Sequence, residues 1–192
     1  MEKKFWPMCV GVMGTYAVFA LWCAHEVFMK GNCAIYQEYK LIENMQIFVL
    51  MATCVVFVLP PAFGKGSDKL IPAAGVLLGY SCVLRELEIK HLDVHWCLKL
   101  VGTGMGRSVI LSVALVALLG YAVAHFSRSV KVSIDFIRSR SGILLMVGGV
   151  LILAGDVCEK SHSFSNDAFF EEILELWGYC LMMLSALSVK LT

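Results

Sequence analysis

The sequence predicts an all-α protein, a polytopic transmembrane helical bundle with about six spans that forms one transmembrane domain over residues 1–192. The first reason is composition, since 59% of the residues are hydrophobic and the mean hydropathy is +0.77. A soluble domain is about half apolar, and a chain of this length cannot hide the surplus in one core. The second reason is that the apolar residues gather into runs of helix length, for which lipid is the natural solvent.

A transmembrane helix needs about 20 consecutive apolar residues. The first of the runs follows Met1-Glu2-Lys3-Lys4 and is too long for the core of a signal peptide, so we expect it to remain as a span. The third run is the weakest, because Arg85 interrupts it before its end. The predicted spans are 5–24, 45–63, 70–88, 108–126, 142–160 and 172–190.

Lys and Arg set the predicted orientation, because they collect on the cytoplasmic side of membrane proteins. With six spans and the N-terminus in the cytoplasm, the C-terminus lies there too. Nine of the 16 cations but three of the 15 acids then fall on the cytoplasmic side. The segment from Arg128 to Arg140 is the strongest single indication. We interpret it as a cytoplasmic loop that can also lie on anionic lipid headgroups.

Charged residues from several predicted spans fall at one depth near the outer end. Asp156 and Glu175 each lie about one turn inside their spans, at a depth similar to that of Arg85. Because ionisable groups in a bilayer are costly, we expect Arg85 to bind these two carboxylates. The network then either locks the bundle or forms a site for an ion or ligand. The predicted polar network comprises Arg85, Glu86, Asp156, Glu159, Glu172 and Glu175.

A carboxylate and two imidazoles follow the third predicted span. Glu88, His91 and His95 are spaced i, i+3 and i+7, which places them on one face of a helix. This ligand set suits zinc or iron, so a divalent metal is a possible cofactor. The alternative is a pair of solvated histidines beside the membrane surface, where Glu86 and Lys90 form an ordinary i, i+4 pair.

The eight cysteines contain no close Cys-x-x-Cys pair, which argues against a zinc ribbon. Cys9, Cys54 and Cys180 lie in apolar runs, where a free thiol behaves as a small hydrophobe. Cys33 and Cys97 lie in polar connections and can pair if those connections face an oxidising compartment; free thiols are the alternative.

Two acidic motifs carry a resemblance. Arg85-Glu86-Leu87-Glu88 ends one predicted span, and Glu171-Glu172-Ile173-Leu174-Glu175 opens the last. Together they resemble a pattern in bacterial polytopic inner-membrane proteins whose activity is not assigned. The resemblance implies a place in a bacterial inner membrane and no particular reaction.

The sequence contains no specific catalytic motif, and its connections are too short for a soluble domain. We therefore expect a non-enzymatic scaffold, sensor or assembly subunit that sits in the lipid bilayer and forms a homo-oligomer or binds a membrane or cytosolic protein. Two alternatives are an ion- or proton-coupled channel or transporter and an outer-leaflet metal-dependent hydrolase. A net charge of +1 gives no reason to expect binding to nucleic acid.

Overall fold

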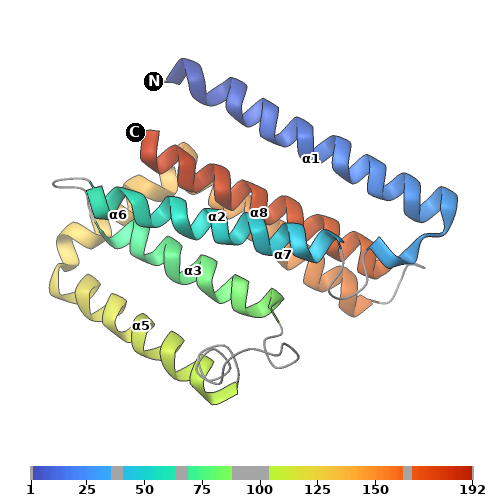
Figure 1. Ribbon diagram of the computed structural model, residues 1–192. Coiled ribbons are helices and arrows are strands. Elements are labelled where there is room, and N and C mark those ends of the chain that lie inside the picture. The colour runs from blue at the N-terminus through green and yellow to red at the C-terminus, as the bar shows by residue number, and fades with distance from the viewer. Residues whose placement is uncertain (1, 36–40, 64–68, 88–103, 162–165, 192) are drawn as a thin grey trace. The chain divides into compact units, whose positions relative to one another are not determined.

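The computed structural model describes residues 2–35, 41–63, 69–87, 104–161 and 166–191 (Figure 1). Within these ranges the chain forms seven α-helices and one short 3-10 helix, so the prediction of an all-α protein is confirmed there. The elements are α1 (Glu2–Lys30), η1 (Cys33–Ile35), α2 (Leu41–Phe63), α3 (Leu70–Glu86), α5 (Gly104–Ala124), α6 (Phe126–Arg138), α7 (Arg140–Ser161) and α8 (Asp167–Leu191).

Five of the described helices are long and apolar enough to cross a membrane, and they indicate an integral membrane protein. Helix α3, which corresponds to the predicted span 70–88, is not among them. Its 17 residues rise about 26 Å, somewhat less than the thickness of a typical hydrocarbon core. The candidate spans are Trp6–Lys30, Leu41–Val58, Gly104–Ala124, Arg140–Cys158 and Asp167–Val189.

The interpretation of the segment from Arg128 to Arg140 as a loop is wrong. Residues Phe126–Arg138 form helix α6, and Arg140 begins α7. The charged residues suggested a loop, yet the apolar residues between them recur at helical spacing, which is the pattern of an amphipathic helix.

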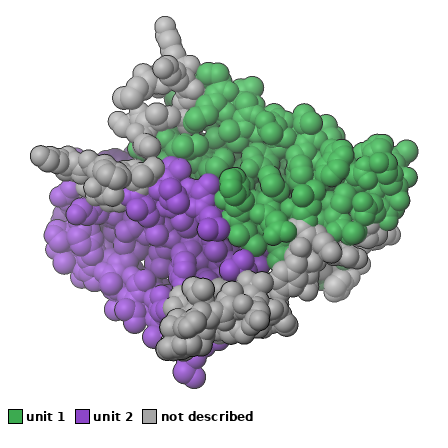
Figure 2. Space-filling view, in the orientation of Figure 1, with its two compact units in different colours: residues 1–49, 140–192 green, residues 50–139 purple. Residues whose placement is uncertain are grey.

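The described chain divides into two compact units (Figure 2). The terminal unit contains residues 1–49 and 140–192, and thus α1, the first part of α2, α7 and α8. The middle unit contains residues 50–139, and thus the rest of α2 with α3, α5 and α6.

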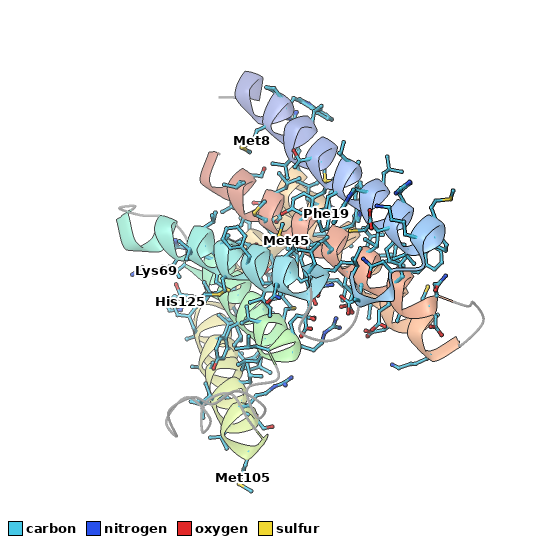
Figure 3. All side chains as sticks on the ribbon, turned by 45° about the vertical axis from the view of Figure 1, so that its right-hand side comes forward. Met8, Phe19, Met45, Lys69, Met105 and His125 are labelled. Carbon is cyan, nitrogen blue, oxygen red and sulfur yellow. The ribbon has the colours of Figure 1, made fainter. Side chains whose placement is uncertain are left out.

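Helix α8 is the core of the terminal unit. In its most apolar stretch, 61% of the residues are buried, whereas in the most apolar stretch of α1 only 11% are buried. Tyr179, Leu176 and Met182 are at most 1% exposed. Helix α1 lies on α8 and leaves a groove of about 300 Å³ lined by Phe19 and Met45, which Figure 3 labels. Among the candidate spans, α8 is therefore the most buried.

Helices α7 and α8 approach each other closely at positions that recur every seven residues, and α7 carries a small residue at each of them. Starting from one end, the facing pairs are Ser141 with Ser185, Gly148 with Gly178, and Gly155 with Glu171. Each step moves two turns along α7 and two turns back along α8, so the helices are antiparallel. Small residues let helix backbones approach in a membrane, where no hydrophobic force draws helices together.

The Ser141–Ser185 pair is hydrogen-bonded as well as close. The Ser141 hydroxyl donates to the Ser185 carbonyl oxygen at 2.7 Å and lies 2.9 Å from the Ser185 hydroxyl. Both side chains are buried, at 5% and 0% exposed. Hydrogen bonds between membrane helices stabilise their pairing modestly, by about 0.6 kcal/mol on average.

In the middle unit, α3 packs on α2 through Gly75 and Gly79. A Cβ atom at Gly75 would lie 2.7 Å from the Phe57 ring, and one at Gly79 would lie 2.7 Å from the Cys54 sulfur. The two glycines are four residues apart and therefore share the face of α3 that receives these side chains. The Arg107 guanidinium on α5 donates to the Leu84 carbonyl oxygen at 3.0 Å, which ties α5 to the end of α3.

Candidate functional site

Three carboxylates meet where α7 and α8 lie against each other in the terminal unit. One carboxylate oxygen each from Asp156, Glu171 and Glu175 lies within 4.8 Å of the others. Glu175 is 3% exposed, and the other two are half-buried. We call these three residues the carboxylate centre.

The local sequence explains why the three groups converge. Glu171 and Glu175 are four residues apart and so share one face of α8. Asp156 follows Gly155, whose missing side chain leaves room for α8. A Cβ atom at Gly155 would lie 3.1 Å from Glu175 Cγ and 3.3 Å from the Glu171 carbonyl oxygen. The carboxylate centre thus lies at Gly155, one of the positions at which α7 and α8 approach each other closely.

The charges of the carboxylate centre strongly constrain its chemistry. Two carboxylate oxygens within 4.8 Å of each other repel by at least about 3.5 kcal/mol at an effective dielectric constant of about 20, if both groups are charged. A proton, a metal cation or a cationic side chain can offset that repulsion. Ca²⁺ binds oxygen ligands at about 2.3–2.6 Å, so oxygens on opposite sides of one ion lie about 5 Å apart. The spacing therefore suits either shared protons or a hard divalent cation.

A buried amide binds Glu172, the residue that follows Glu171 of the carboxylate centre. Gln46 on α2 is 0% exposed, and its Nε2 donates to the Glu172 carboxylate at 2.7 Å and to the Glu172 carbonyl oxygen at 3.0 Å. Among the side chains that the structure describes, the Gln46 Oε1 atom is buried without a hydrogen-bond partner. Gln46 was not among the predicted site residues, although a glutamine within an apolar run was a signal for it.

The predicted polar network is distributed over both units. Asp156 and Glu175 join the carboxylate centre, whereas Glu172 binds Gln46. Glu159 lies on α7, and its side chain is outside the described part. In the middle unit, Arg85 Nε donates to Glu86 Oε1 at 3.0 Å. The pairing of Arg85 with Asp156 and Glu175 stays a prediction.

Two other predictions fall on residues that the structure does not describe. Glu88, His91 and His95, the predicted metal ligands, all lie within 88–103. Cys97 lies there too, and the side chain of Cys33 is likewise outside the described part, so their pairing stays a prediction. Among the described side chains, the free thiols are Cys9, Cys23, Cys54, Cys82, Cys158 and Cys180.

No protein-family model, curated protein or solved structure matches this chain. The class is therefore defined by the fold and the site alone. Within the described residues, this is an all-helical protein with five apolar candidate spans. More particularly, it carries three close carboxylates on a tightly packed pair of those helices.

Proposed function

We propose that this chain is a non-enzymatic membrane scaffold, sensor or assembly subunit that works as part of an oligomer or complex. The observation that carries this proposal is the exposure of α5. This helix, all of whose residues are described, is apolar enough to span a membrane yet has no buried residue. Its side chains Val113 and Val116 are 63% and 68% exposed. A span in which no residue is buried has apolar surface available for another protein.

The proposed topology has six spans with both termini in the cytoplasm. Helix α3 would be the sixth span, because it contains no charged residue before Arg85 and is tied to α5 near its end by Arg107. An even number of spans also keeps the cationic helix α6 and the basic N-terminus on one side, in agreement with the positive-inside rule. The proposed location is a bacterial inner membrane, as the resemblance of the acidic motifs implies.

If α5 contacts another protein, a larger side chain on its exposed face should weaken the oligomer or complex. Val116→Trp should lower the fraction of oligomer or complex seen by native mass spectrometry from nanodiscs, because a large side chain separates two packed helices. Val18→Trp on α1 is the matched control, since Val18 is 69% exposed and α1 is also a candidate span. A wild-type protein that stays monomeric and crosslinks to no partner in cells would contradict the proposal.

A second candidate function is ion- or proton-coupled transport, and the carboxylate centre favours it. Ionisable groups inside membrane helices are costly and mark ion pathways or proton relays. The buried Glu175 lies in a helix that could span the membrane, next to two more carboxylates. Close carboxylates that can take up a proton or a cation are suited to coupling that uptake to transport.

If the protein transports a proton or a cation, the flux should depend on Glu175. In proteoliposomes with a pH or cation gradient, wild-type protein should conduct, and Glu175→Gln should reduce the flux to that of empty liposomes, because the amide cannot take up a proton. Asp135→Asn should keep the wild-type flux, since Asp135 is exposed on α6 and is not part of the carboxylate centre. Absence of flux in the wild type, or full flux in Glu175→Gln, excludes this candidate.

The metal-dependent hydrolase stays a third hypothesis. Its ligands would be Glu88, His91 and His95, with Glu175 as a possible base. Elemental analysis of the purified protein tests it directly, because absence of a bound transition metal would exclude it.

A further inference from the structure

Helix α6 of the middle unit has three distinct sides. Its inward side contains Ser129, which is 7% exposed, and packs against α3 and α5. A second side is apolar but exposed, and a third side is charged. The exposed apolar residues, each at least 40% exposed, are Phe126, Val130, Ile134 and Ile137. The charged residues are Arg128, Lys131, Asp135 and Arg138.

The connections of α6 join it directly to two candidate spans. His125 alone separates it from α5, and Ser139 alone separates it from α7. Both neighbouring helices are candidate spans. A short helix between two spans, with an apolar stripe beside a cationic face, is typical of helices that lie in the layer of lipid headgroups.

At the same end of the middle unit, α3 and α5 line an apolar groove of about 690 Å³. Its walls include Val76, Leu77 and Leu118, and Lys69 and Tyr121 lie at one end. In Figure 3, the labelled Lys69 and His125 lie close together, away from Met105 at the other end of α5. From Lys69 to Tyr80 the groove follows α3 for about 16 Å.

We propose that this groove binds one anionic phospholipid. An acyl chain lies along the apolar walls, and the phosphate lies at Lys69, close to the end of the middle unit that carries the cationic helix α6. Charge complementarity selects this occupant: Lys69 is exposed at the mouth of an otherwise apolar groove, and α6 adds three cations against one acid. The proposal rests on α5 spanning a membrane, and it depends neither on assembly through α5 nor on transport.

The test uses full-length protein in micelles with equal amounts of phosphatidylglycerol and phosphatidylcholine, and native mass spectrometry measures the lipid that is retained. Wild-type protein should retain phosphatidylglycerol selectively. Lys69→Gln should lower that retention about fivefold, since one cation near a phosphate contributes about that factor. Lys160→Gln, which removes an exposed cation from the terminal unit, should retain it normally.

A second variant tests the groove itself. Ala114→Phe places a ring in the groove and should lower retention of both lipids. If the lipid were held only by the surface charge, Ala114→Phe would leave retention unchanged. Equal retention in wild type, Lys69→Gln and Ala114→Phe would overturn the proposal. If Lys69→Gln does not fold, wild-type protein is compared at about 0.05 M and about 1 M salt. Selectivity that does not fall with salt would also overturn it.

Discussion

Gly148→Ala is expected to destabilise the protein by about 1–3 kcal/mol, because the added methyl group has no room between α7 and α8. A Cβ atom at Gly148 would lie 2.8 Å from the Gly178 carbonyl oxygen and 3.3 Å from Leu181 Cβ. A backbone carbonyl cannot rotate away as the end of a flexible side chain can, so the two helices must separate. Unfolding by denaturant in detergent measures the change.

The adjacent glycine provides the matched control. A Cβ atom at Gly149 would meet nothing within 4 Å. Gly149→Ala should therefore leave the packing intact and stabilise the helix by up to about 1 kcal/mol, since alanine favours a helix interior over glycine. The two variants differ by one position and make the same chemical change. If both shift stability in the same direction, the close contact of α7 with α8 is not as described.

Gln46→Glu is expected to cost about 3 kcal/mol or more, because it replaces a donor by an acceptor opposite a carboxylate. In the wild type, Gln46 Nε2 lies 2.7 Å from Glu172 Oε2, and Gln46 is 0% exposed. The variant loses this hydrogen bond and places two carboxylates together in a buried environment. Thermal unfolding of the full-length protein in nanodiscs measures the loss.

Two further variants distinguish repulsion between the carboxylates at positions 46 and 172 from a change in side-chain packing. Gln46→Met keeps the volume and removes the polar group, so it should cost less than Gln46→Glu. Adding Glu172→Gln to Gln46→Glu restores a donor facing a carboxylate and should recover part of the stability, a positive coupling in a double-mutant cycle. Additive losses in that cycle would show that the two side chains do not interact.

Much of the secondary structure could be predicted from the sequence, because it follows from local apolar patterning. Predicted spans 142–160 and 172–190 lie within α7 and α8, and span 45–63 lies within α2. The amphipathic helix α6 was missed, since its charges dominated the interpretation of residues 128–140. The same charges, arranged on one side of a helix, now support a membrane-surface role.

The candidate site could be predicted only in part. A helix rises by a constant amount per residue, so residue counting within the spans is enough to place Asp156 and Glu175 at one depth. The depth of a residue in its span does not specify which faces of two helices contact each other. Glu171, which was not part of the predicted polar network, joins the carboxylate centre, and Gln46 from α2 reaches Glu172.

The sequence by itself determined the class of protein, because an excess of apolar residues in long runs leaves a helix in lipid as the favourable state. It also located six of the seven described α-helices, although α1, α2, α5 and α8 begin three to five residues before the predicted spans. Only the tertiary structure decided which residues face each other, pairing Gly148 with Gly178 and Gly155 with Glu171. That register depends on contacts between residues far apart in the chain. It is the close approach of α7 and α8 at Gly155 that brings three carboxylates together.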